Sequence, residues 1–101
     1  MPTDYEMKLA RGRVAKGLAA LGDKAANIKT GTLSVKSYTY CPLSQAFRAA
    51  GGFTGGLTKL RGGKSAYTKR AQEWSEAHGF DRTPNVSYEA LDIAWGEALA
   101  K

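Results

Sequence analysis

Apolar residues recur every three or four positions in the first third of the chain, which is the spacing of one face of an α-helix. Thr3 and Glu6 precede this stripe with the spacing of a capping box. The stripe consists of Met7, Ala10, Val14, Leu18, Leu21, Ala25 and Ile28. We therefore expect a long first helix with an apolar seam toward the core and a basic outer face that carries Lys8, Arg11, Arg13 and Lys16.

Residues 33–40 alternate with a period of two and include β-branched and aromatic side chains, a pattern typical of a strand. The rest of the sequence offers no evident partner strand, and an isolated strand leaves its backbone groups unpaired. The pattern therefore leaves three alternatives open for this segment: a strand, an extended stretch or a short hairpin.

Three shorter helices are expected in the remainder of the chain. Pro42 suits the first turn of a helix that runs to about Ala50. A second helix is expected from about Ser65 to His78, before the stop at Gly79, with a buried face of Tyr67, Ala71, Trp74 and Ala77 or His78. Ser87 caps a last helix whose apolar stripe is Tyr88, Leu91, Trp95 and Leu99.

These patterns together predict a mainly α fold. We expect a compact bundle of four to five short helices, with at most a short extended segment near residues 33–40. A chain of 101 residues has room for one core, so residues 1–101 are expected to form a single domain.

Residues 51–63 contain three pairs of adjacent glycines, and we expect them to form a loosely held structural turn. The region from Leu43 to Gly63 also resembles a helix-turn-helix, but Gly55 and Gly56 would lie where its second helix needs side chains that read bases. The string from Gly62 to Ser65 resembles the end of a phosphate-binding P-loop. That motif requires a glycine at position 58, which is a threonine here.

Charge is distributed unevenly along the chain. The formal net charge is +6. Residues 1–7 contribute −2, residues 8–70 carry thirteen bases and one acid for +12, and residues 71–101 contribute −4. A basic body of this kind points toward an anionic partner.

The densest basic cluster lies between residues 59 and 70 and includes one aromatic residue, Tyr67. Cations on a glycine-rich backbone can approach phosphates closely, and an aromatic ring can stack on a base. The alternative is an ordinary solvated surface with Tyr67 turned into the core. The first interpretation predicts DNA or RNA as the partner, bound through Lys8, Arg11, Arg13, Lys16, Lys59, Arg61, Lys64, Lys69 and Arg70.

The sequence offers few groups for catalysis or metal binding. It has one cysteine, Cys41, and one histidine, His78, which excludes an intramolecular disulfide and a zinc site with several cysteines. We expect Cys41 to be a buried thiol, His78 to cap the end of its helix, and Trp74 and Trp95 to lie in the core. No enzymatic activity, catalytic residue, metal ligand or cofactor is predicted.

No apolar run approaches the roughly 20 residues of a membrane span, and the first six residues are acidic, unlike the basic start of a signal peptide. We therefore expect a cytoplasmic protein with no membrane partner. The single free thiol is compatible with a reducing compartment.

Several short segments resemble a group of small uncharacterised proteins from actinobacteria and their phages. The shared features are a Cys-apolar-Leu-x-Gln-x-aromatic segment beginning at Cys41, a His-Gly-Phe-Asp turn beginning at His78, and a Tyr-x-x-Leu-x-x-x-Trp helix beginning at Tyr88. The resemblance runs from about Arg13 to the end of the chain. It implies a compact fold and a phage or actinobacterial origin, and it carries no activity.

Two functional hypotheses remain open at this point. The first is a small, non-enzymatic accessory or regulatory protein of phage type that binds nucleic acid through a basic surface. The second is a protein-interaction module, or an inhibitor of a host protein, that docks through exposed aromatic side chains or the glycine-rich segment. Neither pattern nor composition fixes the oligomeric state.

Overall fold

A computed structural model of the chain describes residues 1–48 and 50–100. In this part the chain forms five α-helices and one 3₁₀ helix: α1 (Asp4–Leu21), η1 (Gly22–Asn27), α2 (Pro42–Phe47), α3 (Gly52–Leu60), α4 (Lys69–Ala77) and α5 (Tyr88–Leu99). Extended structure among these residues is limited to one bridge between Thr83 and Val86. The predicted mainly α fold is confirmed. The single domain expected over 1–101 also includes Ala49 and Lys101, which lie outside the described residues.

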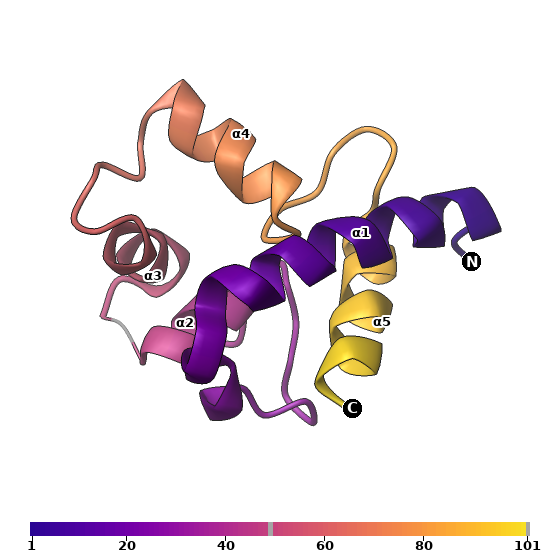
Figure 1. Cartoon of the computed structure of the whole chain (residues 1–101), viewed down its shortest axis with the longest axis horizontal. Helices are drawn as coiled ribbons and strands as arrows, with labels where there is room; N and C mark the ends of the chain where they lie inside the picture. The colour runs from indigo at the N-terminus through magenta and orange to yellow at the C-terminus, as the bar shows by residue number, and fades with distance from the viewer. Residues whose placement is uncertain (49, 101) are drawn as a thin grey trace.

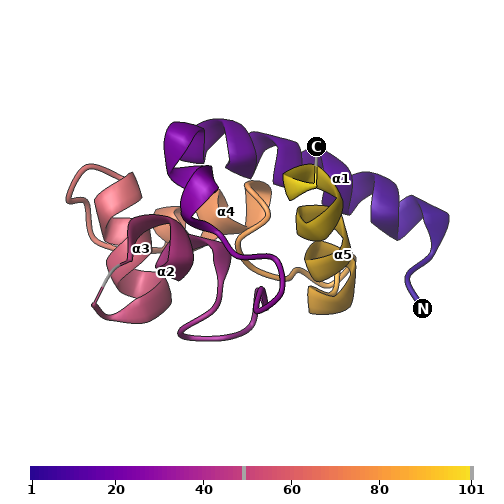
Figure 2. The ribbon, with the colours of Figure 1, turned by 90° about the horizontal axis from the view of Figure 1, so that it is seen from below.

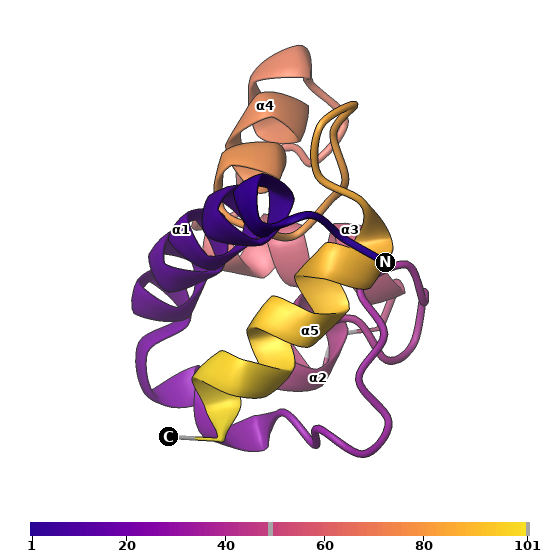
Figure 3. The same cartoon turned by 90° about the vertical axis from the view of Figure 1, so that its right-hand side faces the viewer.

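Helix α1 lies across one side of the molecule, and the other helices lie beneath it (Figures 1 and 2). Figure 3 shows α5 beside α1, while the segment between η1 and α2 passes along the far side of α5. The radius of gyration is 12.3 Å, so the helices form a compact bundle. None of the described helices is both long and apolar enough to cross a bilayer.

The first helix begins as predicted and ends earlier than predicted. The Thr3 hydroxyl accepts a hydrogen bond from the Glu6 backbone N–H at 3.1 Å, which caps α1. Gly22 then adopts a φ of +58°, a left-handed conformation that ends the α-helix. The apolar stripe to Ile28 is therefore not one helix, because η1 changes the direction of the chain and returns Ile28 to the core.

Helix α2 begins at Pro42 as expected, but it ends at Phe47 and not near Ala50. Arg48 stops it by adopting a φ of +48°. Helix α4 begins at Lys69, four residues later than expected, because the Thr68 hydroxyl caps it by accepting the Ala71 N–H at 3.1 Å.

The prediction that Tyr67 faces the core is wrong. Tyr67 precedes the cap of α4, so it does not share the helical stripe of Ala71 and Trp74, and 85% of its surface is exposed. Trp74 is partly buried and Trp95 is fully buried, as expected of core residues.

The glycine-rich segment was expected to be a loose turn, and most of it is instead helix α3. Each glycine inside a helix costs up to about 1 kcal/mol relative to alanine. At Gly56 the cost is offset because the missing side chain lets α3 pack closely on α2. A β-carbon at that position would come within 2.7 Å of the Leu43 carbonyl oxygen of α2. Leu57, next in sequence, is completely buried.

Residues 33–40 form a closed loop with turns, and not a strand. The Ser34 N–H donates to the Tyr40 carbonyl at 3.2 Å, and the Val35 N–H donates to the Asp92 carboxylate on α5 at 2.7 Å. Burial raises the pKa of Asp92, although the hydrogen bond from Val35 and the charge of Lys36 act in the opposite direction. The segment is therefore neither a strand nor a hairpin of paired strands, but a loop of turns closed by one backbone hydrogen bond.

Aromatic rings stack through the centre of the bundle. The centroids of Trp74 and Phe80 are 6.0 Å apart, and those of Phe80 and Trp95 are 5.6 Å apart. Beside them, α1 crosses the turn between α4 and α5 at Gly17, where a β-carbon would lie 2.1 Å from the His78 carbonyl oxygen. The two backbones are therefore in direct contact, and only glycine fits.

This contact predicts opposite effects for two alanine substitutions in the same helix. Gly17→Ala should destabilise the protein by about 2 kcal/mol, because helix α1 must move away from the turn. Gly12→Ala is the matched control: Gly12 has open space around it and should gain up to about 1 kcal/mol in helix propensity. Urea denaturation of both variants measures the difference, and a Gly17→Ala variant as stable as the wild type would contradict this packing.

The start of α5 is held by two side chains. The Ser87 hydroxyl accepts the Ala90 N–H at 3.2 Å, and the Glu6 carboxylate of α1 accepts the Ser87 N–H at 2.7 Å. The Ser87 hydrogen bonds lower the pKa of Glu6. The charged carboxylate therefore joins the first turn of α1 to that of α5.

We expect this link to make stability depend on pH. Because the folded-state pKa of Glu6 is lowered, its contribution is present above the unfolded-state pKa and is lost as the pH falls through the folded-state pKa. Glu6→Gln should therefore be less stable than the wild type near neutral pH, and the difference should shrink in acid, below the ordinary pKa of a glutamate. Urea titrations at both pH values test this, with the exposed Glu73→Gln on α4 as the control.

Candidate nucleic-acid interface

Acidic residues are missing from a long central stretch of the sequence. No Asp or Glu occurs between Lys24 and Arg70, which covers η1 after Asp23, all of α2 and α3, and the start of α4. The acids lie on the first turn of α1, at Asp23, on the later part of α4, in the turn after it and on α5. The fold therefore divides the molecule into a strongly basic part and a part of mixed charge.

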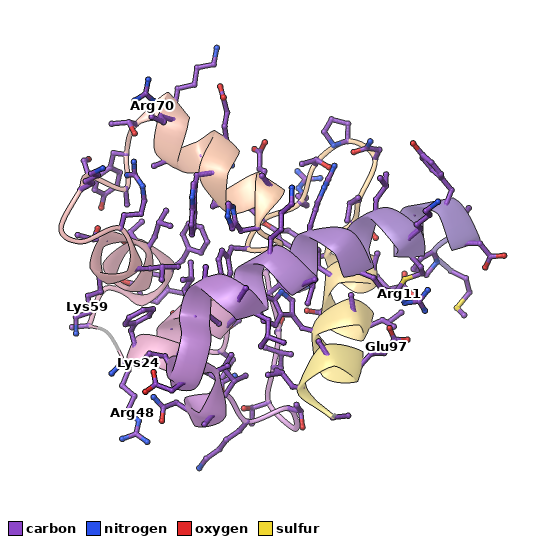
Figure 4. The ribbon with its side chains drawn as sticks, viewed as in Figure 1. Arg11, Lys24, Arg48, Lys59, Arg70 and Glu97 are labelled. Atoms are coloured by element: carbon purple, nitrogen blue, oxygen red, sulfur yellow. The ribbon has the colours of Figure 1, made fainter. Side chains whose placement is uncertain are left out.

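Exposed cations gather along one edge of the basic part. Figure 4 shows Lys24, Arg48 and Lys59 on this edge, and Arg70 on the same side at the start of α4. Lys64 and Lys69 lie in the segment that joins Lys59 to Arg70, and all six side chains are exposed. We call this set the basic edge: Lys24, Arg48, Lys59, Lys64, Lys69 and Arg70.

Packing of α2 between η1 and α3 brings the lower part of the basic edge together. Asn27 of η1 donates to the Ala46 carbonyl at 2.8 Å and accepts a hydrogen bond from the Arg48 guanidinium at 3.3 Å. Arg48 is thereby held next to η1, the element that carries Lys24. Helix α3 packs on α2 through Gly56 and presents Lys59 near its C-terminal end.

The segment after α3 presents the cations of the upper part. The Gly63 N–H donates to the Thr58 carbonyl at 2.8 Å, and the Arg61 guanidinium donates to the Ser65 carbonyl. Arg61 is partly buried and stabilises this loop, whereas Lys64 and the ring of Tyr67 extend into solvent. The segment therefore combines an exposed aromatic ring with exposed cations.

Helix α4 begins with two cations and has no acid in its first turn. The N-terminus of a helix carries a partial positive charge, so Lys69 and Arg70 are each unfavourable there by about 0.3–1 kcal/mol. An anion bound nearby would relieve this repulsion. The unfavourable placement increases the positive potential at this end of the basic edge.

Two of the four cations predicted on α1, Arg11 and Arg13, do not join this edge. The Arg11 guanidinium forms an ion pair with Glu97 of α5, at 2.9 and 3.2 Å, on the side of the molecule away from Lys59 (Figure 4). The hydrogen bond and charge of Glu97 raise the pKa of Arg11. Arg13 donates to the Thr83 hydroxyl at 2.6 Å and to Asn85 at 3.4 Å.

The nine cations predicted from the sequence thus fall into two groups. Lys59, Lys64, Lys69 and Arg70 lie on the basic edge, and Arg61 supports it. Lys8, Arg11, Arg13 and Lys16 belong to α1, where Arg11 and Arg13 already bind side chains of the protein.

Sequence reasoning missed Lys24 and Arg48, which the fold brings to the basic edge. Both are isolated bases in sequence, so no local cluster marked them. The absence of acids between residues 24 and 70 is the signal that could have identified them.

Helices α2 and α3 follow one another in the sequence and pack together, but they are poorly equipped to read bases. A recognition helix contacts base edges through several exposed side chains. Helix α3 has the sequence GFTGGLTKL, and its only charged side chain is that of Lys59. This arrangement favours contacts with phosphates over contacts with base edges.

The remaining reactive groups have structural partners. Cys41 is completely buried, and its sulfur caps α2 by accepting the Ser44 N–H at 3.4 Å. His78 stacks on Trp74 with centroids 3.8 Å apart, and its Nδ1 lies 2.7 Å from the Trp74 carbonyl oxygen. Within the described part of the chain, no cluster of His, Cys, Asp and Glu could hold a metal ion. Residues 62–65 follow a helix, whereas a P-loop follows a strand.

No protein-family model matches this chain, and neither a curated protein nor a solved structure is detectably similar to it. The arrangement of charged and aromatic side chains is therefore the basis for assigning a function.

Proposed function

We propose that the protein binds nucleic acid through the basic edge and acts as a small, non-enzymatic accessory or regulatory protein. The observation that carries this proposal is the gathering of six exposed cations on a part of the fold whose sequence, from Lys24 to Arg70, contains no acid. Nucleic acids present a closely spaced row of phosphates, which such a row of cations complements.

The contacts expected at the basic edge are with phosphates and not with base edges. Long exposed lysine and arginine side chains neutralise phosphates without reading sequence. Because α3 provides few side chains for base contacts, binding should be largely independent of sequence. Arg11 of α1 lies on the side of the molecule away from Lys59, and Debye screening over about 8 Å at physiological salt limits its influence on the edge.

Charge-matched double variants test the proposal. Fluorescence anisotropy with a labelled random-sequence oligonucleotide should show an affinity that falls steeply as salt is added. A plot of the logarithm of the binding constant against the logarithm of the salt concentration should have a slope of about −0.7 to −0.9 for each phosphate neutralised. Arg48→Gln with Lys59→Gln should weaken binding about tenfold or more and reduce this slope by about 1.5. Lys8→Gln with Lys16→Gln removes the same charge from α1 and should change affinity less than about threefold.

Two results would contradict the proposal. Binding that is absent, or that does not depend on salt, would exclude phosphate contacts as the source of affinity. Equal losses in the two double variants would show that net charge matters and the basic edge does not. Thermal unfolding of each variant checks that the fold is retained.

A further inference from the structure

An open cleft of about 190 Å³ lies between the loop at residues 35–38, helix α3 and the segment that leads into α5. Four aromatic side chains line it: Tyr38, Phe53, Phe80 and Tyr88. A cavity of about 150 Å³ is sufficient to hold benzene. The cleft therefore has room for one planar ring system and an aromatic lining to stack against it.

Tyr38 is the exposed wall of this cleft, and its ring packs on Gly52. Its carbonyl accepts a hydrogen bond from the Ser44 hydroxyl at 2.7 Å. Both Cδ atoms of its ring would lie within 3 Å of a β-carbon at Gly52, so one face of the ring covers that glycine. The side chain nevertheless remains 64% exposed, which leaves the ring available for stacking.

The opposite wall combines the ring of Tyr88 with one carboxylate, that of Asp81. Tyr88 donates a hydrogen bond to Asp81 at 2.8 Å, and burial together with this bond raises the pKa of Tyr88 to about 12. The ring is therefore neutral at physiological pH. Asp81 also accepts hydrogen bonds from the Gln72 amide and the Arg82 N–H, both at 2.8 Å, so its carboxylate is already occupied within the protein.

Cations lie on both sides of Tyr38. Lys36 belongs to the lining of the aromatic cleft. On the other side, Tyr38 also lines a second hollow of about 310 Å³, whose wall includes Arg48 of the basic edge. A chain of nucleotides that places one base in the cleft would meet a cation on each side of that base.

We infer that this cleft binds one unpaired base of a single-stranded nucleic acid, stacked against Tyr38, with the neighbouring phosphates on Arg48 and Lys36. The inference rests on the proposed function, and it specifies which form of nucleic acid the protein prefers. A paired base within a duplex is stacked on both sides, so it cannot enter the cleft without being extruded, which costs a few kcal/mol.

Oligonucleotides of equal charge distinguish the contribution of base stacking to the affinity from the contribution of phosphate contacts. A labelled 12-nucleotide thymidine strand should bind about tenfold more tightly than an abasic strand with the same number of phosphates. Tyr38→Leu should remove this preference, because leucine covers Gly52 without providing an aromatic ring. Tyr38→Phe should keep it. The control is Tyr5→Leu, which replaces another exposed tyrosine at the start of α1 and should have no effect.

A crosslinking experiment on the wild-type protein avoids any dependence on variant folding. Irradiation with a strand that carries a single 5-bromouracil should attach the base to Tyr38, in the tryptic peptide of residues 37–48. Crosslinking at Tyr67, which lies in a different tryptic peptide, would overturn the inference.

The failure of this inference is distinguishable from failure of the proposed function. Equal, salt-dependent affinity for the thymidine strand, the abasic strand and a duplex would overturn the inference while leaving phosphate binding by the basic edge intact. The absence of salt-dependent binding to all three would overturn both.

Discussion

The crossing of α1 over the turn between α4 and α5 is the contact on which the rest of the structure depends. Gly17 touches the backbone at His78, and Gly79, with a φ of +76°, lies against the backbone of Val14. Trp95 fills the space beside them, and its indole N–H donates to the Gly79 carbonyl at 2.7 Å. Because water does not reach this buried carbonyl, the bond is costly to break. It fixes α1, the turn and α5 relative to one another.

This crossing also determines where the charges lie. With α5 held against α1, Glu97 reaches Arg11 and Glu6 reaches the first turn of α5. Arg11 of α1 therefore lies next to an acid, whereas the segment from Lys24 to Arg70, which includes α2 and α3, contains none. The net charge of +6 is thus the sum of +9 on residues 24–70, which carry nine bases and no acid, and −3 on the rest of the chain, which carries six bases and nine acids.

Features set by neighbouring residues were predictable from the sequence, and features set by distant contacts were not. The caps at Thr3 and Ser87, the start of α2 at Pro42 and the burial of Trp95 follow from local spacing. Helix α3 was missed because its glycines lower helix propensity, while the packing of Gly56 on Leu43 is visible only in three dimensions. Four of the six cations of the basic edge were predictable, because Lys59, Lys64, Lys69 and Arg70 form a local cluster in the sequence. Lys24 and Arg48 join this cluster only through the packing of α2.

Phe80 belongs both to the central row of stacked rings and to the lining of the aromatic cleft. One wall of the cleft is therefore part of the packed core, and a wall that is already ordered lowers the entropic cost of binding a ligand. The basic edge, by contrast, consists of long exposed side chains whose phosphate contacts weaken as salt rises. Under the proposed function, the affinity for nucleic acid and the preference for single strands then have separate sources. The basic edge supplies most of the affinity, and the cleft distinguishes an unpaired base from a paired one.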